Sequence, residues 1–202
     1  MLKWLFGGPK PLASRADLVP FLAGEAAFIS QKCTFEYCRA RSGLNWDKLF
    51  KEEAFAEAVE ASRWRGFAAV LSDVMMIAES RLRARSGEGS GALVEPLAAV
   101  AAEALAHFPE ARGRQDIDWT AEAAEIRERL AQAQLAPPKR AHEIGLRSGA
   151  IVFDSLPVHP SIRAYDRELV TNNIRFNLAR TATTIEERCD PALVGDLLAW
   201  GR

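Results

Sequence analysis

The chain of 202 residues is long enough to bury one substantial core, and its contents of 49% hydrophobic and 26% charged residues are typical of a globular domain. A formal net charge of −1 provides no overall attraction to nucleic acid or acidic membranes, so we expect no nucleic-acid partner. No run of about 18 apolar residues occurs, which argues against a membrane-spanning helix. Cys33, Cys38 and Cys189 are too few for a disulfide framework, and we expect reduced thiols in a cytoplasmic protein.

Apolar residues at spacings of three and four, with capping and breaking residues between the runs, predict an all-α, single-domain bundle of about six or seven helices with short loops. We expect an N-terminal arm at residues 1–13 and the helical domain at residues 14–202, with a flexible loop at residues 86–91. The expected helices run from Ser14 or Asp17 to about Arg41, Trp46 to Arg85, Ala92 to Phe108, Trp119 or Thr120 to Gln134, Lys139 to Ser155 and Pro160 to Arg188, before a short helix that follows Pro191.

The first expected helix carries rings and charges on nearly the same side, each set recurring every seven residues. The rings are Phe21, Phe28 and Phe35, and the charged residues are Glu25, Lys32 and Arg39. Such a stripe is neither a plain core face nor a plain solvent face. Either the cations extend past the rings to water, or they find partners in apolar surroundings.

The sixth expected helix has a matching face, on which polar residues stand where apolar ones are expected. This face consists of Ile162, Tyr165, Leu169, Asn173, Phe176 and Arg180. If it packs on the first helix, the two helices enclose a polar cluster of Glu25, Lys32, Arg39, Asn173 and Arg180. The cluster is either a satisfied network that fixes helix register or a site for an anion or a carboxylate-bearing ligand.

The link between the first two expected helices is dense in residue types that are enriched at binding hot spots. These candidates for partner binding are Tyr37, Arg39, Arg41, Asn45, Trp46 and Asp47. The alternative is that the rings of this region only form the core of the first helical hairpin. That alternative is weaker for Arg41 and Trp46, which stand at the turn itself.

Patterns typical of metal binding and catalysis are missing from the sequence. Cys33 and Cys38 are five residues apart, which does not match paired zinc ligands. None of the three histidines stands in an H-E-x-x-H or E-x-x-H pattern, and no phosphate-binding loop or nucleophile elbow occurs. We therefore predict no catalytic residues, no metal site and no cofactor.

Together these patterns favour a non-enzymatic helical interaction or adaptor module with an unidentified protein partner, which can also form a homo-oligomer. The first alternative is a small-molecule or anion-binding protein, or an enzyme, that uses the polar cluster between the first and sixth helices. The second alternative is peripheral membrane attachment through residues 1–6, where Trp4 and Phe6 accompany Lys3.

Overall fold

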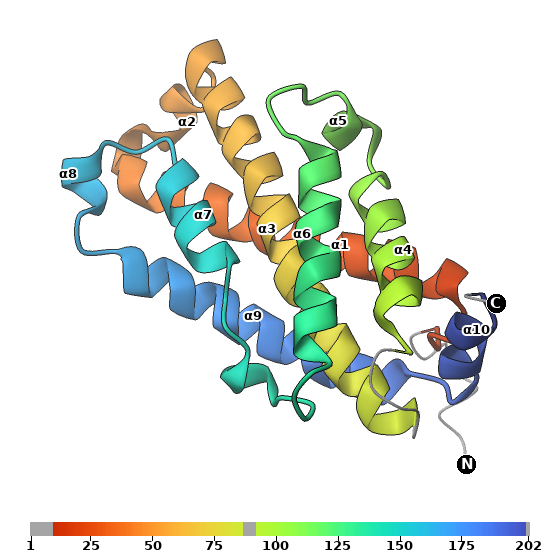
Figure 1. Ribbon diagram of the computed structural model, residues 1–202. Helices are drawn as coiled ribbons and strands as arrows, with labels where there is room; N and C mark the ends of the chain where they lie inside the picture. The colour runs from red at the N-terminus through yellow and green to blue at the C-terminus, as the bar shows by residue number, and fades with distance from the viewer. Residues whose placement is uncertain (1–9, 87–91, 201–202) are drawn as a thin grey trace, which may run out of the picture.

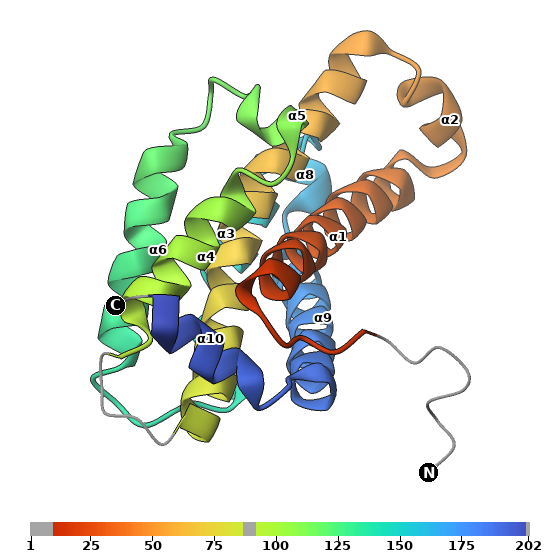
Figure 2. The ribbon, with the colours of Figure 1, turned by 90° about the vertical axis from the view of Figure 1, so that its right-hand side faces the viewer.

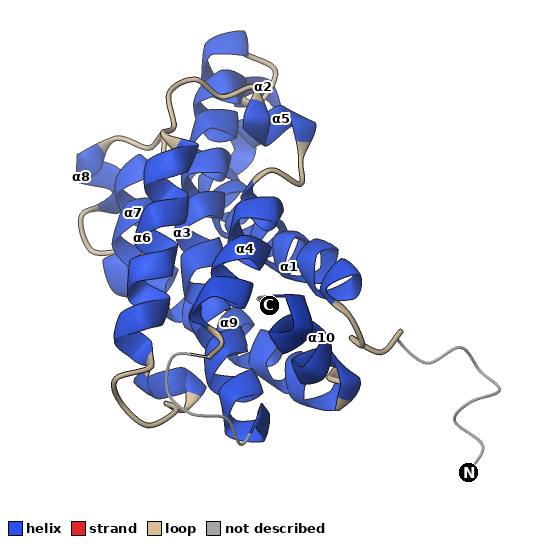
Figure 3. Ribbon diagram, turned by 45° about the vertical axis from the view of Figure 1, so that its right-hand side comes forward, coloured by secondary structure: helices blue, strands red, loops and turns tan. Residues whose placement is uncertain are grey.

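Figure 1 shows the chain as a bundle of helices, and the computed structural model describes residues 10–86 and 92–200. Within these residues no strand is present (Figure 3). The elements are α1 (Arg15–Ser42), η2 (Gly43–Asn45), α2 (Trp46–Leu49), α3 (Glu53–Ser86), α4 (Val94–Leu105), α5 (Pro109–Arg112), α6 (Trp119–Ala133), η3 (Ala141–Glu143), α7 (Ser148–Ser155), α8 (Pro160–Arg163), α9 (Arg167–Arg188) and α10 (Ala192–Trp200). The prediction of an all-α, single-domain bundle is confirmed, with more helices than the expected six or seven.

Helix α3 runs through the middle of the bundle, and α1, α4, α6, α7 and α9 all contact it (Figure 2). Residues 66–80 of α3 are buried without exception. A helix that is buried on all sides needs other helices to cover every face. The arrangement of the surrounding helices therefore follows from α3.

None of the described helices combines the length and the apolar character that crossing a membrane would require.

The expected second helix is wrong as a single helix, because the chain turns between α2 and α3 at Phe50. The Phe50 ring contacts those of Phe35, Trp46 and Phe55, and the ring centres of Phe35 and Phe50 are 4.7 Å apart. These contacts add to the burial of apolar area at this corner. The aromatic residues near the first turn thus stabilise the α1–α2–α3 corner.

The expected fifth helix begins later than predicted, because a residue of α3 sets its first turn. The Asp73 carboxylate accepts hydrogen bonds from the backbone N–H groups of Arg147 and Ser148 at 3.0 and 2.9 Å, and from the Ser148 hydroxyl at 2.6 Å. The first N–H groups of a helix have no partner within that helix. Asp73 therefore caps α7 from another helix.

The expected sixth helix is likewise divided, into α8 and α9. Between them, the Asp166 side chain accepts a hydrogen bond from Tyr37 of α1.

Residues 10–13, within the expected N-terminal arm, lie against the end of α9. The Leu12 N–H donates to the Arg188 carbonyl at 2.8 Å, and the Asp190 N–H donates to the Leu12 carbonyl at 2.9 Å. The Leu12 side chain is fully buried. The remainder of the arm, residues 1–9, and residues 87–91 of the expected flexible loop lie outside the described residues.

Helices α1 and α3 cross closely at Gly66. A Cβ atom on Gly66 would lie 2.4 Å from Oγ of Ser30 on α1 and 3.1 Å from a methyl carbon of Val152 on α7. Ser30 Oγ also donates to the Arg63 carbonyl at 2.6 Å, so it is held in this crossing. The missing side chain of Gly66 allows three helices to meet at the centre of the bundle.

Gly66→Ala places a methyl group in this crossing, and we expect it to lower the free energy of unfolding by about 1–3 kcal/mol through overpacking. Urea unfolding measures the loss. In a Ser30→Ala background the nearest atom is gone, so the same substitution should cost less. An equal cost in both backgrounds would show that the crossing with Ser30 is not the source of the strain.

Candidate functional site

Helices α1 and α9 lie side by side on one side of α3 (Figure 2), and a charged contact joins them at one end. Tyr37 Oη donates to Asp166 Oδ2 at 2.6 Å, and the Arg41 guanidinium forms an ion pair with the same oxygen. The hydrogen bond from Tyr37, together with Arg41, lowers the pKa of Asp166. Burial raises the pKa of Tyr37. Asp166 is thus a charged anchor that fixes the start of α9 on α1.

Farther along the same junction, Glu25 of α1 binds two residues of α9. Its Oε2 accepts hydrogen bonds from the Thr181 hydroxyl at 2.6 Å and from the Arg180 guanidinium at 3.2 Å. The Arg180 guanidinium carbon lies 4.9 Å from the Phe28 ring centre, and the Lys32 nitrogen lies 5.6 Å from the same centre. Cations within about 6 Å are attracted to the face of such a ring. Rings and charges on α1 therefore cooperate in binding α9.

The residues of the expected polar cluster form a row of contacts along the α1–α9 junction and are not enclosed. Arg39 does not take part in these contacts. Asn173 Oδ1 accepts a hydrogen bond from the Asn177 amide at 3.1 Å and one from the Cys33 thiol at 3.5 Å. Arg39 is exposed and forms no ion pair with the rest of the described chain. The structure thus brings Glu25, Lys32, Asn173 and Arg180 to one junction without enclosing them.

The apolar residues of the expected sixth helix point to solvent, whereas the sequence pattern suggested a core face. Their exposed fractions are 54% for Ile162, 98% for Tyr165, 59% for Leu169 and 73% for Phe176. A second stripe on α9, which includes Ile174, Leu178 and Ile185, is buried in the core instead. We call Tyr165, Leu169 and Phe176, together with the half-exposed Phe28, the α1–α9 surface.

A groove of about 160 Å³ lies between α1 and α9 within this surface. It is lined by Lys32, Cys33, Glu36, Tyr37, Ala40, Leu169, Val170 and Asn173. An apolar cavity of about 150 Å³ is enough to hold benzene. The groove therefore has room for one aromatic or branched aliphatic side chain.

The structure divides the expected partner-binding residues into two groups. Tyr37 and Arg41 are engaged with α9 as described above. The others are exposed around the turn that follows α1, namely Arg39, Asn45, Trp46 and Asp47. Asp47 forms an ion pair with Lys51 at 2.6 Å, and Trp46 is 39% exposed. The turn itself is formed at Gly43, whose positive φ of 55° favours glycine.

A pocket of about 270 Å³ is lined by residues of α3, α6 and the segment 136–145, and by none of α1. Arg83 Nε lies 2.6 Å from Oε1 of the buried Glu79, and an Arg129 nitrogen lies 3.0 Å from Oδ1 of the buried Asp73. Burial raises the pKa of Glu79, although Arg83 acts against this shift. The sequence patterns above did not indicate this pocket. The available signal is the presence of two acidic residues, Asp73 and Glu79, in the largely apolar middle of α3.

Other chemistry is limited in the part of the chain that the structure describes. No group of three or more His, Cys, Asp or Glu side chains there could hold a metal ion. Burial raises the pKa of the Cys33 and Cys38 thiols to about 12, so both stay protonated and unreactive near neutral pH.

Comparisons with protein-family models, curated proteins and solved structures give no match to this chain.

Tyr37→Phe removes the hydroxyl that binds Asp166 and keeps the ring. We expect the free energy of unfolding to fall by about 1–2 kcal/mol near neutral pH, because a hydrogen bond to a charged group is lost. Since the pKa of Asp166 is lowered on folding, the stabilisation is present above about pH 4 and disappears as the pH falls further. Urea unfolding of both proteins from neutral to acidic pH measures this difference. A difference that does not change with pH would contradict an ionised Asp166 as the partner.

Proposed function

We propose that this protein acts by contact, as an interaction module that self-associates through the α1–α9 surface. The observation that carries the proposal is the exposure of three rings on this surface, 45% for Phe28, 98% for Tyr165 and 73% for Phe176. A fully exposed aromatic side chain presents about 150–250 Å², so the three present on the order of 400 Å². Patches of this size on a monomer are often functional. The area is also about half of what each partner buries in a standard interface.

The shape of the surface supports a second copy of the chain as the partner. Protruding rings and the groove of about 160 Å³ lie on the same face, with Leu169 belonging to both. In a two-fold symmetric dimer each copy presents the same patch to the other. A ring of one copy can then enter the groove of its partner while its own groove receives the partner's ring.

The charges around the surface support the same partner. The residues concerned are Lys32, Glu36 and Arg39 of α1 and Glu168 and Arg175 of α9. Among the described residues none of these five forms an ion pair, whereas Glu25 and Asp166 nearby are both paired. Both signs are present in similar numbers, so a two-fold contact can bring cations of one copy to carboxylates of the other.

The proposal includes an adaptor role without catalysis, in the cytoplasm. The three free cysteines support a reducing compartment. The exposed Trp46 corner stays a predicted contact for a further protein partner. Membrane attachment through residues 1–6 also stays a prediction, because these residues lie outside the described chain.

Phe176→Asp places a charge in the centre of the proposed interface. We expect the wild-type protein to show a concentration-dependent shift from monomer to dimer mass, and the variant to have a dissociation constant at least about tenfold higher. Sedimentation velocity over a range of protein concentrations measures both.

Leu135→Asp is the matched control, because Leu135 is 84% exposed just after the end of α6 and does not line the groove between α1 and α9. It should associate like the wild type. The proposal would be overturned by a wild-type protein that is monomeric at every concentration, or by equal effects of the two substitutions.

A further inference from the structure

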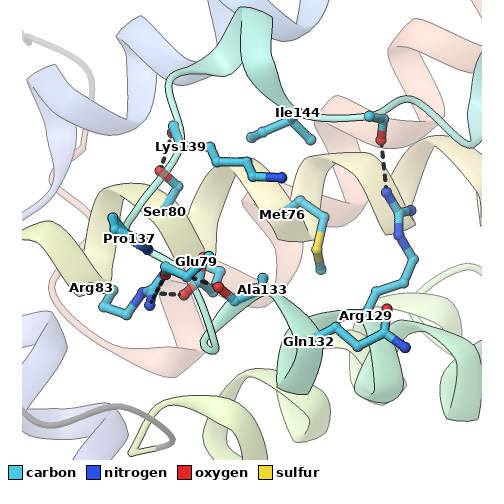
Figure 4. Close-up of a pocket in the computed structure, with 12 residues that line it drawn as sticks. Met76, Glu79, Ser80, Arg83, Arg129, Gln132, Ala133, Pro137, Lys139 and Ile144 are labelled. Atoms are coloured by element: carbon cyan, nitrogen blue, oxygen red, sulfur yellow. Dashed lines mark hydrogen bonds and ion pairs between the residues drawn. The ribbon is translucent and has the colours of Figure 1, made fainter.

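The pocket between α3 and α6 has the Glu79–Arg83 ion pair at one end and Met76 beside Gln132 and Arg129 at the other (Figure 4). Its lining includes Met76, Glu79, Arg83, Arg129, Lys139 and Ile144. Figure 4 shows Glu79 and Arg83 together beside Ala133, whereas the Lys139 side chain lies between Ser80 and Ile144 with its nitrogen directed toward Met76. A ligand in this pocket therefore meets an ion pair, an ammonium group and apolar walls.

The pocket is formed in advance, because side chains of the two helices hold the segment that closes it. Arg83 donates to the carbonyls of Ala136 at 2.8 Å and Ala133 at 3.1 Å. Arg129 donates to the carbonyl of Gly145 at 3.0 Å, and the Ser80 hydroxyl donates to the carbonyl of Lys139. Binding sites that need little rearrangement lose less free energy on binding.

The charges of the lining leave one cation uncompensated. Glu79 pairs with Arg83, and Arg129 pairs with Asp73. Within the described residues, no carboxylate lies within ion-pair distance of the Lys139 nitrogen. Lys139 is exposed at the rim of the pocket, so water solvates its ammonium in the free protein and an anionic group of a bound ligand would pair with it. The thioether of Met76 and the hydrocarbon side chain of Ile144 on the same lining suit a short apolar chain.

We propose that this pocket binds a small organic monocarboxylate, with the carboxylate near Lys139 and a short alkyl chain against Met76 and Ile144. A pocket of about 270 Å³ limits the ligand to a small molecule. Glu79 and Arg83 neutralise each other, and Arg129 is paired with Asp73, so a second carboxylate would lose its hydration in the pocket without meeting a free cation. This site is separate from the α1–α9 surface, so each proposal can fail while the other holds.

Three six-carbon probes test the charge requirement, namely hexanoate, its neutral amide hexanamide, and the dicarboxylate adipate. We expect hexanoate to cause saturable changes in the backbone amide NMR signals of Ser80, Lys139 and Gly145, with a dissociation constant on the order of 1 mM. Hexanamide and adipate should bind at least about tenfold more weakly.

Lys139→Gln removes the ammonium, and we expect it to weaken hexanoate binding at least about tenfold. Lys48→Gln is the matched control, because Lys48 is exposed like Lys139 but belongs to α2 and does not line the pocket. Lys139→Glu should abolish binding, and the unchanged amide spectrum elsewhere reports that both variants are folded. The proposal is overturned if hexanoate shows no saturable change, if hexanamide or adipate binds as well, or if Lys139→Gln binds like Lys48→Gln.

Discussion

The burial of residues 66–80 of α3 is the constraint on which the rest of the structure depends. All of these residues are buried, so the surrounding helices must each present one apolar face inward. The polar side chains in this segment need partners, since an unpaired buried charge is costly. Asp73 meets this need by capping α7, and Glu79 does so by pairing with Arg83. Each partner also fixes the position of a neighbouring helix or segment.

The same constraint explains why one apolar stripe of α9 is buried and the other is exposed. The stripe with Ile174, Leu178 and Ile185 covers α3, and the stripe with Leu169 and Phe176 is left on the outside. Both stripes repeat at spacings of three and four, so periodicity alone cannot tell which one is buried. Two contacts along the α1–α9 junction, one at Asp166 and one at Glu25, hold α9 in the orientation that exposes the second stripe.

The sequence patterns predict the fold class and the positions of the long helices, because these depend on local composition and on caps such as Ser14 and Asp118. They do not predict the breaks before α7 and α9, since the side chains that set them come from distant parts of the chain. Asp73 acts on a segment more than 70 residues away, and Tyr37 acts on one more than 120 residues away. Propensity and local capping contain no information about such contacts.

For the candidate sites, too, the sequence patterns predict what depends on local spacing and miss what depends on contacts between distant residues. Seven-residue spacing of rings and charges identified α1 as unusual, and its partner helix was found through the odd positions of Asn173 and Arg180. The structure shows that these charges and rings bind each other across the junction, at distances such as 4.9 Å between Arg180 and Phe28. The pocket beside Lys139 could not be found this way, because Pro137-Pro138 and the residues after them have no periodicity to interpret.

The most direct measurement is a dilution series followed by NMR of isotope-labelled phenylalanine and leucine side chains. If the outward stripe of α9 is an interface between two copies, the signals of Phe28, Leu169 and Phe176 shift or broaden together as the concentration rises, while those of Leu135 do not change. Signals of the α1–α9 surface that are independent of concentration, or changes centred on Leu135, would contradict this assignment.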